Sequence, residues 1–141
     1  MMKISARNVL STKISRVTNG AVNSEIVLEL HGGQEIVSII SKASAGNLGL
    51  AAGVPAFAIV KANEVIVGTG LESAALSARN VLRGKIVRIE NGAVNSEVGI
   101  EIAGGIEITA LITKASVERL SLKPGGEAFA VMKASSVIVG V

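Results

Sequence analysis

The chain has 141 residues, of which 49% are hydrophobic and 18% charged, so it carries enough apolar surface to fold rather than stay disordered. Its net charge of +3 is too small to indicate a general binder of polyanions, and the absence of cysteine excludes a disulfide framework. The longest apolar stretch, residues 50–60, is far shorter than the ~20 residues of a membrane helix. Because the first residues lack a secretory signal pattern, we expect a cytoplasmic protein.

The sequence is a tandem duplication. Shifting it by 72 positions aligns residues 1–69 with residues 73–141 without a gap, and 37 of the 69 pairs are identical. The stretch between the repeats has the composition of a linker. We therefore expect a first domain over residues 1–69, a linker over residues 70–75 and a second domain over residues 76–141.

The first three strands of each repeat are predicted from their residue patterns. In the first repeat, residues 4–17 are expected to form one long opening strand, and the alternation over Glu25–Leu30 predicts a second. The glycine pair beginning at Gly32 marks a turn that includes His31, and Glu35–Ser41 follows as a third strand that is apolar on both faces. The same patterns recur 72 positions later, with strands at Glu97–Ile102 and Glu107–Thr113.

A short helix is expected after the third strand, followed by two closing strands. In the second repeat, Thr113–Leu122 has a capping hydroxyl, a helical pattern and a stop at Pro124. The first repeat has two glycines in the same stretch, which predicts a weaker helix. Ala56–Lys61 and Val65–Val67 are the expected closing strands. Five strands with a helix between the third and fourth indicate a mainly β protein of two tandem five-stranded oligonucleotide/oligosaccharide-binding (OB) barrels.

Units of this size are marginally stable alone, and strands that are apolar on both faces would leave exposed apolar surface in a monomer. We therefore expect the repeats, or several subunits, to pack these faces together.

The polar residues that recur in both repeats are mostly hydrogen-bond donors. Ten of the 14 lysines and arginines recur in pairs, together with three pairs of hydroxyl side chains. The basic pairs are Arg7/Arg79, Lys13/Lys85, Arg16/Arg88, Lys42/Lys114 and Lys61/Lys133, and the hydroxyl pairs are Ser5/Ser77, Ser41/Thr113 and Ser44/Ser116. A site rich in N–H and O–H donors and poor in acceptors suits a fully ionised oxyanion and disfavours a protonated one.

The start of the short helix is a second reason to expect an anion. If Ser41 and Thr113 are the N-caps, Ser44 and Ser116 fall at the third helical position, beside free backbone N–H groups at the positive end of the helix. Each block also has a purely structural explanation. These explanations are an ordinary helix cap, a strand edge with a surface arginine for "SARN", a tight turn with left-handed geometry for "GAVNSE", and solvated surface charges for Lys61 and Lys133. Their joint recurrence favours a shared ligand site.

The recurring blocks resemble a known family. "SARN", "GAVNSE", "SKAS" or "TKAS", and "KA" followed by "VIVG" occur in this order in each repeat, and this order is similar to that of the Mop, or molbindin, domain. The gapless tandem resembles the di-Mop form. The resemblance implies an OB-type fold and a cytoplasmic protein that binds molybdate, with tungstate as an analogue, for molybdenum storage or homeostasis. It also implies a homotrimer with oxyanion sites at its interfaces. The scarcity of aromatic residues and the shortness of the apolar stretch predict no nucleic-acid and no membrane partner.

The resemblance further implies two kinds of oxyanion site and no directly coordinated metal. The first kind joins the "SAR" segment of one unit to the helix start and the "KA" strand end of a neighbouring unit, which here are Ser5, Ala6, Arg7, Asn8, Ser41, Ser44, Lys61 and Ala62, and Ser77, Ala78, Arg79, Asn80, Thr113, Ser116, Lys133 and Ala134. The second kind lies near a threefold axis and involves the "GAVN" turns, which here are Gly20, Ala21, Val22 and Asn23, and Gly92, Ala93, Val94 and Asn95.

Three other classes of function remain to be weighed. A nucleic-acid-binding OB barrel needs aromatic stacking platforms, and the chain offers only two phenylalanines. A regulatory sensor module would use the same binding unit, but no helix-turn-helix or P-loop pattern accompanies it. An enzyme is not expected, because there is one histidine, no cysteine and no cluster with metal-ligand spacing.

Overall fold

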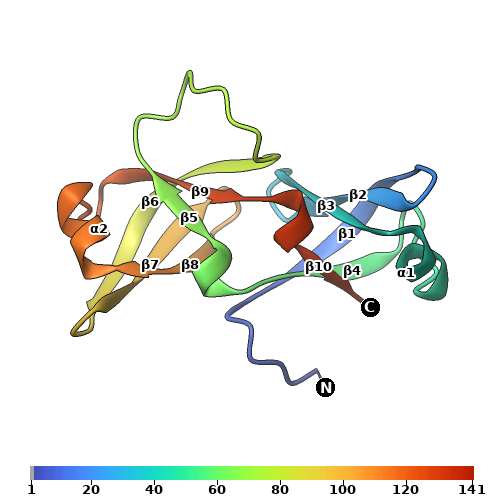
Figure 1. Cartoon of the computed structure of the whole chain (residues 1–141), viewed down its shortest axis with the longest axis horizontal. Helices are drawn as coiled ribbons and strands as arrows, with labels where there is room; N and C mark the ends of the chain where they lie inside the picture. Colours follow the sequence, from blue (N-terminus) through green and yellow to red (C-terminus); the bar gives the residue numbers. More distant parts are fainter. Residues whose placement is uncertain (1) are drawn as a thin grey trace.

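The computed structural model describes residues 2–141 and contains two curled, antiparallel five-stranded sheets side by side, each followed after its third strand by a short helix (Figure 1). The expectation of a mainly β chain with two OB-like five-stranded units is confirmed. Within residues 2–141, no helix has the length and hydropathy needed to cross a membrane.

The elements of the two repeats correspond one to one. In the first repeat they are β1 (Asn8–Asn19), β2 (Asn23–Leu30), β3 (Glu35–Ser41), α1 (Lys42–Asn47), β4 (Pro55–Val60), the 3-10 turn η1 (Ala62–Glu64) and β5 (Ile66–Gly68). In the second repeat they are β6 (Asn80–Asn91), β7 (Asn95–Ile102), β8 (Ile106–Thr113), α2 (Lys114–Arg119), β9 (Glu127–Met132), η2 (Ala134–Ser136) and β10 (Ile138–Gly140). Both helices have six residues, so the two glycines of the first repeat do not shorten its helix.

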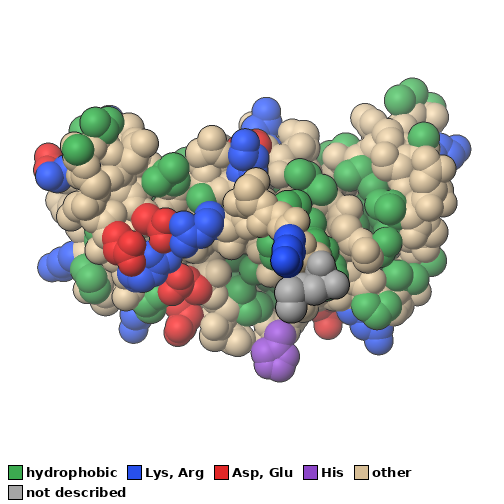
Figure 2. Space-filling view, turned by 90° about the horizontal axis from the view of Figure 1, so that it is seen from below, with side chains coloured by type: hydrophobic (Ala, Val, Ile, Leu, Met, Phe, Trp, Pro, Cys, Tyr) green, Lys and Arg blue, Asp and Glu red, His purple; other side chains and the backbone are tan. Residues whose placement is uncertain are grey.

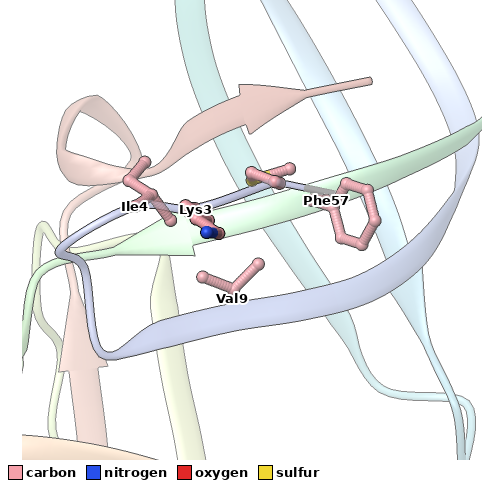
Figure 3. Close-up of a pocket in the computed structure, with 5 residues that line it drawn as sticks. Lys3, Ile4, Val9 and Phe57 are labelled. Atoms are coloured by element: carbon pink, nitrogen blue, oxygen red, sulfur yellow. The ribbon is translucent and has the colours of Figure 1, made fainter.

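The opening strand begins later than its residue pattern predicts. We expected it to start at residue 4, but β1 starts at Asn8, where it faces Val60, the last residue of β4. Residues 2–7 have no ladder partner, so they run outside the sheet. Figure 3 shows this segment passing over Phe57 and Val9, with which Met2, Lys3 and Ile4 line a cavity of about 560 Å³.

The closing strand of each repeat belongs to the sheet of the other repeat. The first sheet has the order β10-β4-β1-β2-β3 and the second the order β5-β9-β6-β7-β8. Ile138 of β10 faces Ile59 of β4, and Ile66 of β5 faces Val131 of β9. Each barrel therefore has the expected five strands, but its fifth strand comes from the other repeat. This exchange ties the two repeats into one folding unit (Figure 1).

The core of each sheet is aliphatic, as the composition requires. Ile14, Ile26, Leu28 and Ile36 are buried in the first sheet, and their counterparts in the second are Ile86, Val98, Ile100 and Ile108. The pairing register shifts between Ile14 and Arg16 and between Ile86 and Arg88, so both long strands carry a β-bulge that bends them. The bend curls each sheet around its own core.

The two glycine turns meet where the repeats face each other. Gly32 and Gly104 both have positive φ, at 96° and 84°, which confirms the expected turns between β2 and β3 and between β7 and β8. A Cβ atom on Gly32 would lie 2.9 Å from the Cα atom of Gly104, so the backbones approach too closely for a side chain. His31 lies in the same turn, as expected, and Figure 2 shows it projecting from the surface.

Candidate functional site

The antiparallel pairing of β1 with β4 brings two of the recurring blocks together. Asn8 faces Val60, so the "SAR" segment just before β1 lies beside the "KA" residues just after β4. Ser5, Ala6, Arg7, Lys61 and Ala62 line a cavity of about 170 Å³, which Asn63 and, from the other repeat, Leu111 complete. We call Ser5–Arg7 with Lys61–Ala62, and Ser77–Arg79 with Lys133–Ala134, the inner half-sites.

The inner half-site of the second repeat has the same origin but a different lining. Asn80 faces Met132, so Ser77 and Ala78 come close to Lys133. Their cavity of about 370 Å³ is larger, because Leu71 of the linker and Leu76 at the start of the second repeat add to its lining. Its other lining residues are Ile66, Gly68 and Val131.

Within a single chain, each "KA" strand end shares a cavity with the "SAR" segment of its own repeat. The resemblance implies that the "KA" strand end comes from a neighbouring unit, whereas Lys61 lies beside Ser5 of its own repeat and Lys133 beside Ser77 of its own repeat. The reason is the strand order, since the first and fourth strands of a repeat are direct neighbours. The neighbouring repeat contributes a different set of contacts.

The arginine of each inner half-site is paired with a glutamate of the other repeat. Arg7 donates two hydrogen bonds to the Glu97 carboxylate, at 2.5 and 2.9 Å, and Arg79 donates one to Glu25 at 2.9 Å. The hydrogen bond from Arg79 lowers the pKa of Glu25, and hydrogen bonds from Arg7 and Arg88 lower that of Glu97. Because these arginines are neutralised, the uncompensated positive charge has to come from another residue of each half-site.

Lys61 and Lys133 supply that charge. Among residues 2–141, no carboxylate lies within ion-pair distance of either ammonium group. Each lysine is exposed and directly precedes a 3-10 turn, whose first backbone N–H groups have no acceptor inside the turn. An inner half-site therefore combines one free ammonium group with several N–H and O–H donors.

A larger charge network surrounds Glu97 in the second repeat. Arg88 lies 2.6 Å from Glu97, 3.0 Å from Glu107 and 3.3 Å from Glu90. In the first repeat the equivalent contact, from Arg16 to Glu25, is 3.8 Å long. Figure 2 shows one cluster of acidic and basic side chains in the left half of the view, with other charged side chains spread over the surface. Glu97 is thus held from two sides.

The two asparagines of the "SARN" blocks are fully occupied by the fold. The Asn8 amide donates to the carbonyls of Thr109 and Val60, at 2.8 and 3.2 Å, and its oxygen accepts from the Thr109 N–H at 2.7 Å. Asn80 makes the equivalent pair of bonds with Val37, at 2.9 and 2.7 Å. We expected both asparagines among the ligands, but they bind the backbone of the other repeat. Sequence reasoning missed this role because the partners lie far away in the chain.

The helix starts are capped as expected. Ser41 is the N-cap of α1 and its Oγ accepts from the Ser44 N–H at 3.0 Å, while Thr113 Oγ1 caps α2 by accepting from the Ser116 N–H at 3.1 Å. The two hydroxyls of each pair also lie 2.8 Å apart.

The "GAVN" turns lie directly beside these helix starts. Lys42 N–H donates to the Val22 carbonyl at 2.7 Å and Lys114 N–H to the Val94 carbonyl at 2.8 Å. We call the turn Gly20–Asn23 with Ser41 and Ser44, and the turn Gly92–Asn95 with Thr113 and Ser116, the outer half-sites.

The left-handed geometry considered for these turns is wrong. Neither Gly20 nor Gly92 has positive φ. Glycine is needed at the first position for another reason, because a Cβ atom on Gly20 would lie only 3.0 Å from the Asn23 carbonyl oxygen.

Inner and outer half-sites of one repeat lie far apart. β1 has 12 residues and separates the "SAR" segment from the "GAVN" turn, a span of roughly 40 Å at the usual rise of a strand. The outer half-sites lie at the two far ends of the molecule, near α1 and α2, and the inner half-sites lie near its middle (Figure 1). The structure brings each "SAR" segment to its "KA" residues and each helix start to its "GAVN" turn, but it does not join these two groups within a chain.

Comparison with known proteins identifies the repeats. The family model of the TOBE domain matches twice, over residues 4–67 and 76–139. The chain is 40% identical over 140 residues to the molybdenum-pterin-binding protein MopA of Rhodobacter capsulatus, covering 99% of this chain and 53% of MopA. It therefore spans about half the length of that relative.

Two further comparisons match one repeat and the tandem pair, respectively. A probable molybdenum-pterin-binding protein of Haemophilus influenzae is 52% identical over 66 residues, which cover 96% of that protein and 47% of this chain. A crystal structure of the cytoplasmic molybdate-binding protein ModG, with molybdate bound, superimposes with a TM-score of 0.96 at 48% sequence identity and covers 99% of both chains. The chain therefore belongs to the TOBE domain family and is a tandem pair of Mop (molbindin) units, the di-Mop form of that family.

Proposed function

We propose that this protein binds molybdate. The observation that carries the proposal is the inner half-site, where Lys61 or Lys133, with no carboxylate of residues 2–141 in ion-pair distance, lines the same cavity as Ser5 or Ser77. Such a group of donors without a free carboxylate suits a tetrahedral dianion. The proposal is supported by the ModG structure, which is described as holding molybdate and shares 48% of its sequence with this chain.

The same donors give a basis for selectivity. Phosphate carries a proton near neutral pH and would need an acceptor, which the inner half-sites do not offer, whereas molybdate is fully ionised. Tungstate has the same charge and nearly the same size, so it is expected to bind as an analogue. Sulfate has the right charge and is smaller, so its exclusion depends on the size of the cavity.

We also propose that the binding sites are completed between chains, in a homotrimer. Within a repeat the outer half-site lies roughly 40 Å from the inner one, so we infer that a second chain completes the shell of donors. Apolar surface is available for such contacts: Val22 and Val94 are 72% exposed at the tips of the turns, and Ile66 and Ile138 of the exchanged strands are 57% and 52% exposed. Exposed apolar residues of this kind are typical of subunit interfaces.

The task we infer is storage or buffering of molybdate in the cytoplasm, by reversible binding without a chemical reaction. The relatives support this inference through their names, which refer to binding or transport of molybdenum rather than to catalysis.

The test is equilibrium dialysis of the full-length protein against sodium molybdate, with tungstate, sulfate and phosphate as competitors. We expect saturable molybdate binding, competition by tungstate, and none by equimolar sulfate or phosphate. Replacing Lys61 and Lys133 together by methionine should weaken binding at least about tenfold, because both half-sites lose their free charge. The matched control replaces Lys13 and Lys85 by methionine and should bind molybdate like the wild type. This recurring pair lies on β1 and β6 and faces Glu29 and Glu101. Equal losses in both variants, or sulfate competing as well as tungstate, would contradict the proposal.

A further inference from the structure

Each "SAR" segment is held in place by the other repeat. Residues 5–7 and 77–79 lie outside the sheets, so no strand ladder fixes their backbone. The contacts that fix it are made by the arginine and the asparagine side chains of each "SARN" block. In the first repeat, Arg7 binds Glu97 and Asn8 binds the backbone of Thr109.

The asparagine contact replaces a missing strand. β8 is the last strand of the second sheet, so one side of it has no partner strand. Asn8 donates to the Thr109 carbonyl and accepts from the Thr109 N–H, the same two bonds that a paired residue in a neighbouring strand would make. Asn8 is 2% exposed, so these bonds are shielded from water. Asn80 does the same for Val37 on β3, the edge strand of the first sheet.

The strands that hold the "SAR" segment also carry the outer half-site of the second repeat. Thr109 lies four residues before Thr113, the N-cap of α2, which is about 13 Å along the strand. Glu97 lies two residues after Asn95, the last residue of the "GAVN" turn, and Asn95 faces Thr113 in the β7–β8 pair. One rigid pair of strands therefore contacts an inner half-site in its middle and an outer half-site at its end.

We propose that Glu97 and Glu25 are positioning residues for the oxyanion sites, acting through Arg7 and Arg79. Glu97 holds the "SAR" backbone of the first repeat against β7 and β8, which carry the outer half-site of the second repeat. Glu25 holds that of the second repeat against β2 and β3 in the same way. The affinity of an inner half-site then depends on a carboxylate that does not touch the anion. This inference rests on the proposed function. It adds Glu25 and Glu97, which the sequence analysis did not include among the binding residues.

Electrostatics alone predicts the opposite effect. A carboxylate near an anion site repels the anion, and it also neutralises an arginine that could attract it. If Glu97 acted only as a charge, replacing it by glutamine would free Arg7 and strengthen molybdate binding. If Glu97 positions the "SAR" backbone, the same replacement weakens binding, because the donors of Ser5–Arg7 lose their fixed geometry.

The experiment is isothermal titration of the full-length protein with sodium molybdate, comparing the wild type with Glu97→Gln. We expect about tenfold weaker binding at the sites that contain the first inner half-site, the size typical of lost outer-shell contacts. Glu25→Gln should weaken the sites that contain the second. The matched control is Glu127→Gln, which breaks the pair between Arg83 and Glu127 at 2.6 Å, inside one repeat and without contact to a half-site. We expect that variant to bind within about twofold of the wild type.

A second variant covers the case in which Glu97→Gln folds poorly. Glu97→Asp keeps the charge but draws the carboxylate away from Arg7. A positioning role therefore predicts weaker molybdate binding, whereas a purely electrostatic role predicts no loss of affinity. Unchanged or tighter binding in Glu97→Gln or Glu97→Asp, with wild-type melting behaviour in the absence of molybdate, overturns the inference and leaves molybdate binding intact. A wild-type protein that does not bind molybdate overturns the proposed function instead.

Discussion

Ser38 donates a hydrogen bond of 2.6 Å to the carbonyl of Val137, although the two residues are 99 positions apart. Both are buried, and Val137 directly precedes the exchanged strand β10. The bond therefore fixes the point at which the end of the second repeat joins the first sheet. The second repeat has Ala110 at the position equivalent to Ser38, so it lacks the hydroxyl that would make the same bond near β5. The exchange is thus anchored by this bond on one side only.

Replacing Ser38 by alanine should destabilise the protein by about 1–2 kcal/mol, because the buried Val137 carbonyl loses its donor. The measurement is chemical denaturation of the full-length protein. Ser11→Ala, on an exposed position of β1, is the control and should change the free energy of unfolding by less than about 0.5 kcal/mol. Equal effects of the two substitutions would show that the bond to Val137 does not stabilise the exchange.

Gly104→Ala should be much more destabilising than Gly105→Ala. Both glycines have positive φ, at 84° and 74°, so alanine is strained at either position. A Cβ atom on Gly104 would also collide with the backbone of His31 and Gly32, whereas one on Gly105 would meet nothing within 4 Å. We expect a cost of roughly 1–2 kcal/mol for the strain alone and clearly more for the collision, measured by thermal melting. Similar melting temperatures for both variants would mean that the two turns do not pack closely in solution.

The cap and ligand roles of the outer half-site can be separated by two substitutions. Thr113→Ala removes the acceptor for the Ser116 N–H and should cost about 1 kcal/mol of stability. Ser116→Ala leaves that cap bond in place and removes only a hydroxyl, so it should keep stability within about 0.5 kcal/mol. If Ser116 contacts the oxyanion, the same variant should still weaken molybdate binding by roughly tenfold. Ser116→Ala with normal affinity would leave Ser116 with no role in binding.

Acid should weaken the contact between the repeats. Hydrogen bonds from Arg79 and from Arg7 lower the pKa values of Glu25 and Glu97 below 4.5, their ordinary value. Their contribution to stability is therefore full above that pH and is lost as the pH falls through the lowered pKa values. We expect the melting temperature of the wild type to fall with acidification by roughly 2–5 °C more than that of the Glu25→Gln, Glu97→Gln double variant. Parallel pH profiles would show that these pairs add nothing to stability.

Local patterns identified most elements of this fold, although they placed the start of β1 four residues too early. The alternation over Glu25–Leu30 identified β2 to within two residues, and the hydroxyls of Ser41 and Thr113 identified the start of each helix. These predictions succeeded because strand alternation and helix capping depend on residues a few positions apart. The recurring blocks also identified most of the candidate half-sites, since a duplicated sequence marks the positions that both copies keep.

The roles of Arg7 and Asn8 could not be predicted in this way. Both belong to the "SARN" block, and the sequence pointed to them as ligands. In the structure their side chains bind Glu97 and Thr109, which lie 90 and 101 positions further along the chain. A pattern read along one repeat contains no information about contacts made with the other.

The sequence by itself determined that the protein is a duplicated β fold with donor-rich blocks in each copy, because composition, alternation and capping act over short distances. Only the tertiary structure decided that β5 and β10 change places and that inner and outer half-sites lie apart. Strand exchange depends on where the chain leaves one sheet, at Lys61 and Lys133, and on which sheet edge is free to receive it. Both conditions arise only when the two repeats pack against each other.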